Sequence, residues 1–283
     1  MNDKRFLLAS IQAAIEAGDA ILQVYHSSNF NIEEKADRSP LTLADRRSHD
    51  VIMKHLSAFD IPILSEEGPS VPYPKRKNWD AFWLIDPLDG TKEFIKKNGE
   101  FTVNIAMIRD HKPVAGVIFV PDRDILYFAS EAIGSFRADF SLISDLVNRQ
   151  RPDATGSRQT EETLTGIINQ SAQLPVEDST ERPFVIAGSR SHSTPQLEAF
   201  VEEKRREYGE VEFISAGSSL KLCLVAEGRA DIYPRTGPTM EWDTAAGQAI
   251  VEISGGKVYQ YDTTEPLNYN KENLLNPWFV VTR

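Results

Sequence analysis

The sequence has little cysteine, an excess of acidic over basic residues, and few long apolar runs. Its single cysteine, Cys223, excludes an intrachain disulfide and a zinc site built from several cysteines. Lys and Arg number 31 against 42 Asp and Glu, which gives a formal net charge of −11. A field of that sign repels polyanions, so nonspecific binding to nucleic acid or to an anionic membrane is not expected.

Apolar stretches near the N-terminus are interrupted. Gln12 and Glu16 break the run from Phe6 to Ile15, so no secretory signal core is expected there. No apolar run is expected to be long enough to cross a membrane. These features predict a reduced, cytoplasmic location without a transmembrane segment, and they leave peripheral membrane association open.

The residue patterns predict a mixture of helices and strands. The 283 residues are 41% hydrophobic and can bury a large core. Residues 3–25 and 42–59 have helical spacing, and strands are expected at 61–64, 82–85, 102–109, 114–120 and 126–130. Residues 148–182 are polar and predict a surface insertion, with a strand at Leu164–Ile168. After them we expect strands at 184–187, 211–214, 230–233 and 257–261 and helices at 195–206, 220–226 and 242–253.

The most informative segment is residues 83–94, WLIDPLDGTKEF. Asp86 and Asp89 are expected to converge on a turn where Pro87 ends a strand. Hard carboxylate oxygens without Cys or His suit Mg²⁺ or Mn²⁺. A helix beginning near Thr91 would point its free N–H groups at the same place, where a phosphate could bind.

Further acidic residues occupy comparable positions. Glu66 and Glu67 close an apolar run, Asp243 opens a helical pattern, and Asp45 lies in the first turn of a predicted helix. Such loop and helix-start positions often gather into active sites. Each also has a plainer interpretation when taken alone, as a capped turn, an N-cap or a helix-dipole partner.

Together the motifs resemble the lithium-sensitive, magnesium-dependent phosphatase superfamily. It contains inositol monophosphatases, fructose-1,6-bisphosphatases and 3'(2'),5'-bisphosphate nucleotidases. The matching segments are Glu66–Glu67, Asp86–Thr91 and Trp242–Ala246. Longer matches favour the bacterial nucleotidase branch, and they lie at Lys35–Asp45, Asp86–Ala106, Ser189–His192, Gly217–Gly228 and Tyr233–Gly247. The resemblance spans nearly the whole chain except about residues 145–180.

The resemblance implies an α+β fold of alternating helix and sheet layers in two lobes, like that of inositol monophosphatase and fructose-1,6-bisphosphatase. Residues 1–145 would form a metal-binding lobe, and residues 146–181 a surface insertion or linker. Residues 182–283 would form the second lobe, with the substrate-pocket residues and the metal ligand Asp243.

The resemblance also implies a metal site and catalytic groups. The implied ligands of two or three Mg²⁺ ions, for which Mn²⁺ could substitute, are Glu66, Asp86, the Leu88 carbonyl, Asp89 and Asp243. Glu67 would lie behind these ligands. Thr91, hydrogen-bonded to Asp45, matches the water-activating pair, and Glu66 joins them as a catalytic group. The N–H groups of Gly90 and Thr91 would take the phosphate oxygens.

The second lobe is implied to select the substrate. Lys221 and Arg235 match nucleotidase positions near the second phosphate or the nucleoside, and Ser218 and His192 match further pocket groups, with Asp243 beside them. From the residues alone, Lys221 and Arg235 read as surface cations and His192 as a loop or capping residue.

Three functions remain as hypotheses. The first is Mg²⁺-dependent, lithium-sensitive hydrolysis of adenosine 3',5'-bisphosphate to AMP and phosphate, in sulfate assimilation or nucleotide turnover. The second is hydrolysis of an inositol or sugar monophosphate, and the third is metal-dependent nucleotide binding without catalysis. Residues 91–94, TKEF, depart from the T-x-N-[FY] pattern of inositol phosphatases. The complete Thr91 and Asp45 pair disfavours a pure binding protein. The partner expected is a small phosphorylated nucleotide, and the chain could be a monomer or a homodimer.

Overall fold

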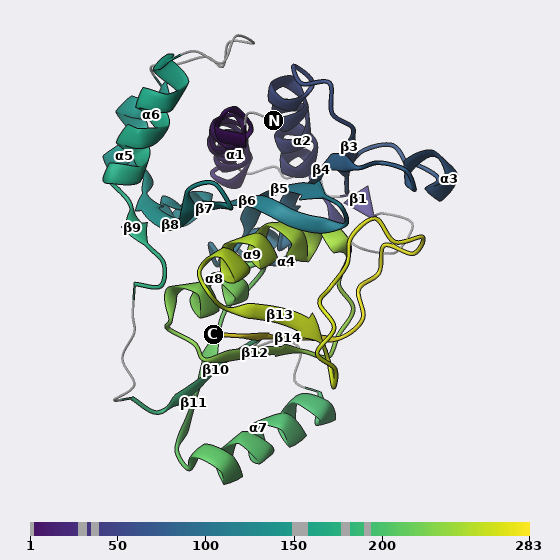
Figure 1. The fold of residues 1–283 in the computed structure, drawn as a ribbon, viewed down its shortest axis with the longest axis vertical. Helices are drawn as coiled ribbons and strands as arrows, with labels where there is room; N and C mark the ends of the chain where they lie inside the picture. The colour runs from purple at the N-terminus through teal and green to yellow at the C-terminus, as the bar shows by residue number, and fades with distance from the viewer. Residues whose placement is uncertain (1–2, 28–32, 35–39, 149–157, 177–181, 190–193) are drawn as a thin grey trace.

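A computed structural model describes residues 3–27, 33–34, 40–148, 158–176, 182–189 and 194–283. Its helices are α1 (Asp3–Tyr25), α2 (Leu43–Leu56), α3 (Tyr73–Arg76), α4 (Thr91–Ile95), α5 (Phe140–Asn148), α6 (Arg158–Asn169), α7 (Pro195–Tyr208), α8 (Leu220–Glu227) and α9 (Glu241–Ile253), with the 3₁₀ turn η1 at Pro121–Arg123. Within these residues the elements stack as alternating layers of helix and sheet (Figure 1). The layered α+β architecture inferred from the sequence is confirmed.

The first sheet is mostly antiparallel and has seven strands among the described residues. In spatial order they are β3 (Ile63–Ser65), β4 (Ala81–Asp89), β5 (Thr102–Arg109), β6 (Lys112–Val120), β7 (Ile125–Ser130), β8 (Gly134–Asp139) and β9 (Ala172–Gln173). A short separate pair joins β1 (Glu33–Glu34) to β2 (Pro40–Leu41). β4 and β5 are buried along almost their whole length. Such strands are expected where helices cover both faces of a sheet.

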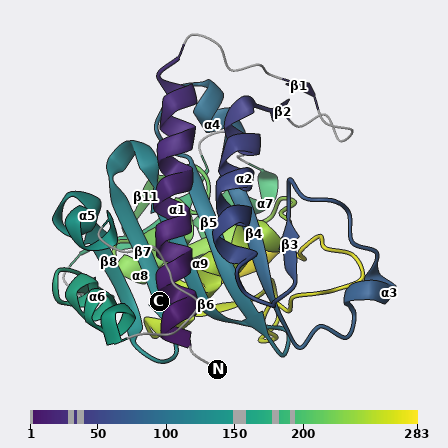
Figure 2. The same ribbon diagram turned by 90° about the horizontal axis from the view of Figure 1, so that it is seen from above.

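Side chains of β4 alternate between two hydrophobic cores. Trp83 and Ile85 pack with α1 and α2, whereas Phe82 and Leu84 pack with α8 and α9. Figure 2 shows α1 and α2 lying across one face of the sheet. This alternation follows from the two-residue period of a strand and allows one sheet to serve two layers.

The second sheet, also counted over the described residues, has five strands. Their order is β11 (Val211–Ser215), β10 (Phe184–Gly188), β12 (Ile232–Arg235), β14 (Phe279–Thr282) and β13 (Lys257–Gln260). β10 is parallel to both β11 and β12, so the carboxyl ends of these three strands lie at one edge. Loops that leave the carboxyl ends of parallel strands commonly form ligand sites.

Helix α9 packs against strands of both sheets and contacts β6 closely. A Cβ added to Gly116 on β6 would lie 2.4 Å from the Ala246 carbonyl oxygen of α9. Glycine is therefore required at this point, because a larger residue would push the helix off the sheet. The approach brings the start of α9 to the end of β4.

Helix α1 is long and apolar enough, by length and composition, to cross a membrane. This differs from the expectation that no run reaches that length. However, 72% of its most apolar 18-residue window is buried inside the protein. Its side chains pack on the first sheet and on α2, as in the core helix of a folded domain.

The expected strand at Leu164–Ile168 is wrong. These residues lie in helix α6, where the side chains of Leu164 and Ile167 are buried. Their spacing places both on one face of a helix, which packs against α5 and α1. The sequence patterns also did not predict β8, α5 or β14. The boundaries of the two proposed lobes stay a prediction.

Candidate active site

The loop through Asp86 and Asp89 is held by hydrogen bonds from two directions. The Leu88 N–H donates to Asp86 Oδ1 at 3.0 Å, and Ser48 Oγ of α2 donates to the Pro87 carbonyl at 2.6 Å. Pro87 was expected to end the strand, but β4 continues to Asp89 through an irregularity in its pairing with β5. Proline is tolerated there because a bulged residue needs no ladder N–H.

Gly90 turns the chain from β4 into α4. Its φ is +88°, and an added Cβ would lie 3.1 Å from the Glu100 carbonyl oxygen and 3.2 Å from Ser218 Cβ. Glycine adopts this left-handed conformation without strain and leaves room for the neighbouring loop. Helix α4 then begins at Thr91, as the sequence predicted.

Asp45 lies in the first turn of α2 and contacts both that helix and Thr91. Its Oδ2 accepts hydrogen bonds from the Thr42 N–H at 2.7 Å and from Thr42 Oγ1 at 2.6 Å, which completes a capping box. Its other oxygen, Oδ1, lies 3.3 Å from Thr91 Oγ1. The expected hydrogen bond between Thr91 and Asp45 is therefore present, and capping fixes the orientation of the carboxylate.

Four carboxylates approach one another where β3, β4 and α9 meet. Burial raises the pKa of Asp86 well above its usual range, and repulsion from Glu66, Asp89 and Asp243 adds to the shift. Burial also raises the pKa of Asp243, with a further contribution from Asp89. Buried carboxylates that repel each other need a proton or a cation between them.

This donor set fits a hard divalent cation. It consists of carboxylates from β4, the end of β3 and the start of α9, and it contains no sulfur or imidazole. Among the described residues, no three carboxylate, imidazole or thiol groups converge closely enough to enclose an ion as they stand. The fit therefore rests on the chemistry of the oxygens and on their mutual repulsion, which a divalent cation would relieve.

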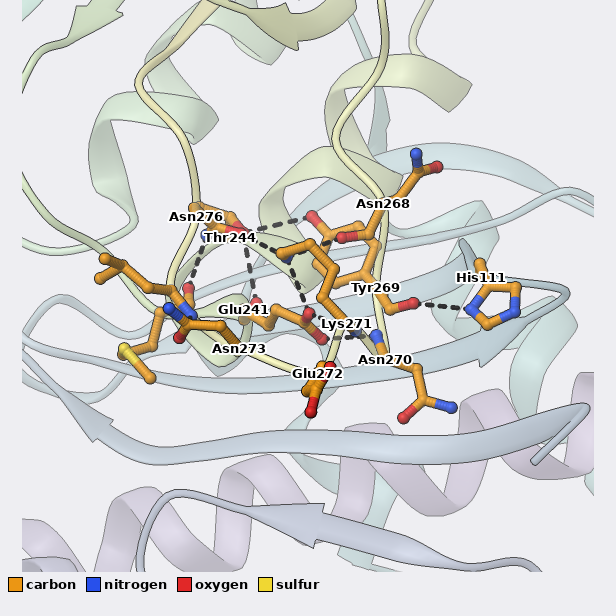
Figure 3. A network of polar contacts seen from close by, with 12 residues as sticks. His111, Glu241, Thr244, Asn268, Tyr269, Asn270, Lys271, Glu272, Asn273 and Asn276 are labelled. Atoms are coloured by element: carbon orange, nitrogen blue, oxygen red, sulfur yellow. Dashed lines mark hydrogen bonds and ion pairs between the residues drawn. The ribbon is translucent and has the colours of Figure 1, made fainter. Parts of the chain in front are cut away.

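A polar network anchors the start of α9, and so places Asp243 (Figure 3). Glu241 is fully buried and accepts hydrogen bonds from the Asn270 N–H at 2.6 Å and from Lys271 Nζ at 2.7 Å. Asn276 Nδ2 donates to the Met240 carbonyl at 2.8 Å. The segment after β13 thus fixes the amino end of the helix. The role of Glu241 is not predictable from the sequence, because no spacing rule links it to a segment so far along the chain.

Two further polar residues join the acidic groups. Ser219 Oγ lies 2.7 Å from Asp89 Oδ2 and 2.9 Å from the Asp243 carbonyl oxygen. Asn104 Nδ2 donates to Ser219 Oγ at 2.9 Å. Both residues fall inside the longer sequence matches, but nothing in their type or spacing distinguished them from neighbouring polar residues.

A cavity of about 130 Å³ lies beside the acidic groups. Residues from both sheets and from helices α8 and α9 line it. Asp89, Gly90 and Asp243 line it together with Lys221 and Arg235. Ser218 also lines it, has φ +41°, and holds a buried hydroxyl without a hydrogen-bond partner among the described residues. The structure therefore brings these predicted residues together. His192 lies outside the described residues.

Lys221 is buried and is not a surface cation. Its Nζ donates to the carbonyl oxygens of Ser218 at 2.6 Å and Ala216 at 3.2 Å, and it lies 5.5 Å from the centre of the Tyr233 ring. Burial lowers the pKa of Lys221 to about 8. Arg235 donates from Nη2 to the Pro238 carbonyl at 3.0 Å, while its buried Nε has no partner among the described residues. Donors of this kind suit an anionic ligand.

Comparison with known proteins identifies the family. The family model described as the inositol monophosphatase family matches residues 2–278. The chain belongs to the inositol monophosphatase family. It is 42% identical over 275 residues to the 3'(2'),5'-bisphosphate nucleotidase CysQ of Escherichia coli strain K12, with 96% of this chain and 97% of that protein covered.

Other members of the inositol monophosphatase family are also similar to this chain. The CysQ nucleotidase of Haemophilus influenzae is 34% identical, with 92% of this chain and 86% of that protein covered. The crystal structure of CysQ from Bacteroides thetaiotaomicron superposes with a TM-score of 0.84 at 47% identity, covering 98% of this chain and 96% of that chain. An inositol monophosphatase of Thermotoga maritima has a TM-score of 0.67 at 21% identity, covers 96% of this chain and 90% of that chain, and supports the fold.

Proposed function

We propose that this protein is a Mg²⁺-dependent 3'(2'),5'-bisphosphate nucleotidase that converts adenosine 3',5'-bisphosphate to AMP and phosphate. The observation that carries the proposal is the joining of two groups in one cavity. The acidic side chains of Asp89 and Asp243 line it together with two cations, the buried Lys221 and the half-buried Arg235. A substrate with two phosphates would place one near each group. The relatives with this name support the substrate class.

In the proposed mechanism the scissile phosphate lies beside the acidic groups. Glu66, Asp86, the Leu88 carbonyl, Asp89 and Asp243 would hold Mg²⁺, which supplies positive charge to the phosphoryl and leaving oxygens when bound. The N–H groups of Gly90 and Thr91 would donate to phosphate oxygens, with Glu67 behind the ligand set.

Thr91 and Asp45 would orient the attacking water. The Thr91 hydroxyl donates a hydrogen bond to Asp45 Oδ1. The lone pairs of Thr91 Oγ1 are then available to accept a hydrogen bond from a water molecule. Asp45 is held in place by its capping bonds and can receive the proton that Thr91 passes on. Inversion at phosphorus then releases AMP.

Selection of the nucleotide would come from β12 of the second sheet, from α8 and from the loop that precedes α8. Lys221 and Arg235 would contact the second phosphate, and the Ser218 hydroxyl would donate a hydrogen bond to the substrate. His192 is proposed to lie beside them. We further propose that the enzyme acts in the cytoplasm as a monomer or a homodimer. It would serve sulfate assimilation or nucleotide turnover.

The decisive experiment compares two substrates. Purified protein with Mg²⁺ should release phosphate from adenosine 3',5'-bisphosphate with a kcat/KM at least about a hundredfold above that for inositol 1-phosphate, because only the first engages both cations. Equal values for the two substrates would favour a general inositol or sugar phosphatase. Tight nucleotide binding without turnover would instead indicate a binding protein.

A further inference from the structure

A second cavity lies on the opposite side of the loop that begins α8. Its volume is about 400 Å³, and three arginines from separate segments line it: Arg123 of η1, Arg137 of β8 and Arg229 after α8. Its apolar wall includes Leu220 and Leu224. Nothing in the proposed reaction uses this cavity.

One buried carboxylate, Glu227, contacts two of these three arginines. The Glu227 side chain is 3% exposed, lies 3.1 Å from Arg137 Nε and 3.5 Å from Arg229 Nη1, and accepts the Tyr127 hydroxyl proton at 2.7 Å. Burial, together with Cys223 and Glu227, raises the pKa of Tyr127, so the phenol stays protonated as a donor. The cavity wall therefore carries three guanidinium groups and a single carboxylate.

The neighbouring acids do not fill the cavity. Arg137 also contacts Asp139 at 3.1 Å, and Arg123 contacts Glu100 at 3.0 Å, but neither acid lines the cavity. The side chains of Arg123 and Arg229 are 41% and 50% exposed. Each guanidinium carries five N–H donors in a planar fork that matches a tetrahedral oxyanion. The three guanidinium groups are paired with Glu100, Asp139 and Glu227, and of these acids Glu227 alone lines the cavity.

The arginine-lined cavity also connects to the candidate active site. Glu100 accepts from Arg123 at Oε1 and from the Gly217 N–H at Oε2, at 3.0 and 2.9 Å. Gly217 and Lys221 line the substrate cavity, whereas Ala216 and Leu220 of the same segment line the arginine cavity. The two cavities therefore share one wall, and Glu100 ties that wall to Arg123.

We propose that the arginine-lined cavity binds a small organic anion that carries a phosphate or sulfate group. The oxyanion would lie between Arg123 and Arg229, and the organic part would contact the apolar wall. An anion that draws Arg123 toward itself loosens its contact with Glu100, and so changes how firmly the Gly217 loop is held. The effect on substrate affinity rests on the proposed function, but the binding site itself does not.

The test uses sulfate and inorganic phosphate as probes on the full chain with Mg²⁺ present. Arginine Nε–H signals are followed by NMR during titration with potassium sulfate or phosphate, at an ionic strength kept constant with potassium chloride. Arg123 and Arg229 signals, assigned with Arg→Gln variants, should shift and saturate. In Arg229→Gln the dissociation constant read from Arg123 should rise at least about tenfold.

Two controls make the outcome decisive. Arg206→Gln removes the same charge from the exposed face of α7 and should change the dissociation constant by less than about twofold. Lys221→Ala removes a substrate-cavity cation and should leave the Arg229 shift intact. Shifts that do not saturate, or equal weakening by Arg206→Gln, overturn the site. A shift lost in Lys221→Ala also overturns it, because the anion then binds in the substrate cavity.

The connection between the cavities is measured separately. In wild type, sulfate should change KM for adenosine 3',5'-bisphosphate by more than in Arg229→Gln, while kcat stays similar. An identical response of the two proteins overturns the connection. Saturable sulfate binding without any turnover supports the arginine site and contradicts the proposed nucleotidase function.

Discussion

At the scale of single residues, the acidic and basic groups of the site have different tasks. Asp86, Asp89 and Asp243 repel one another and suit a cation, whereas Lys221 and Arg235 suit an anion. Asp89 and Asp243 line the same cavity as Lys221 and Arg235. Because the two sets attract opposite charges, a change at one set should be separable from a change at the other.

Asp89→Asn should preserve the fold and remove most activity. The amide keeps the shape of the side chain and deletes one negative charge from the proposed ligand set. We expect kcat to fall about 10²–10³-fold, as for other losses of transition-state stabilisation. Steady-state kinetics over a Mg²⁺ series, with circular dichroism as the folding control, measure this. Turnover near wild type at saturating Mg²⁺ would remove Asp89 from the ligand set.

Lys221→Ala or Arg235→Ala should change substrate choice. Charge-assisted contacts with a second phosphate are each worth roughly 1.5–3 kcal/mol. We expect kcat/KM for adenosine 3',5'-bisphosphate to fall about ten- to a hundredfold. Hydrolysis of a small monophosphate should change little. An equal loss for both substrates would mean that these residues support the fold or the metal site.

The lowered pKa of Lys221 predicts a pH dependence. Burial lowers this pKa to about 8, and the nearby charge of Arg235 lowers it further. The carboxylates of Asp89, Glu93 and Glu100 act in the opposite direction and raise the pKa. The charged form therefore predominates below pH 8 and is lost above it. Because kcat/KM reports the free enzyme, its value for the bisphosphate should decline above about pH 8.

Lys221→Arg provides the control for this decline. Arginine keeps its charge throughout the accessible range, so the decline above pH 8 should disappear in this variant even if the absolute rate is lower. A small monophosphate should show no such step with the wild-type enzyme. If Lys221→Arg retains the step, another group is responsible for it.

At the scale of the elements, the placement of α9 decides whether the site forms. Its start is fixed by Glu241 and the segment from Asn268 to Asn276, and its middle lies directly on β6 at Gly116. The sequence predicted this helix and the position of Asp243 in its first turn. It gave no sign of the Glu241 network, because that network pairs residues distant in sequence through ordinary amide and carboxylate groups.

Glu241→Ala should destabilise the protein strongly. The change leaves the Lys271 ammonium and two backbone N–H groups without their buried acceptor. Removing one partner of a buried ion pair costs about 3–5 kcal/mol. Urea denaturation should show this loss. Glu161→Ala, which removes an exposed partner of Lys4, is the matched control and should change stability much less. Similar midpoints for the two variants would contradict the anchoring role.

Local patterns explain which elements were predictable. β5 was predicted with its observed bounds, Thr102–Arg109, because its apolar and β-branched run is bounded by clear turn residues. The predicted strand at Leu164–Ile168 is wrong because apolar residues are few in the helix that contains it, so its short apolar stretch is a stronger local signal than the helical spacing. The continuation of β4 past Pro87 depends on how β5 pairs with it, which composition does not reveal.

At the scale of the whole molecule, the layered fold places two kinds of chemistry at one junction. The first sheet supplies Asp86 and Asp89, strand β12 of the second sheet supplies Arg235, and helices α8 and α9 supply Lys221 and Asp243. Family resemblance predicted this layered arrangement, and the fold and the family comparisons confirm it. The contacts of Ser219 and Asn104 across the junction could not be predicted from the sequence, because they join three separate elements.

The enzyme as a whole should depend on Mg²⁺ and be sensitive to lithium. Excess chelator should abolish phosphate release from adenosine 3',5'-bisphosphate, and added Mg²⁺ should restore it. Lithium should inhibit at concentrations where sodium does not, because a small monovalent ion can enter an oxygen site yet supplies too little charge. Full activity in metal-free protein, or identical lithium and sodium titrations, would contradict the metal assignment.

The packing of α9 on the first sheet also has a consequence for synthesis on the ribosome. Strands β4 to β8 leave the ribosome long before α9, and the face that α9 covers stays bare in the meantime. At about 5–20 residues per second, the interval between Asp89 and Asp243 lasts roughly 8–30 s. A nascent chain in that interval would offer an apolar surface to chaperones and would lack one of its proposed metal ligands. Chaperone association should therefore end, and the ability to retain metal begin, only when α9 has emerged.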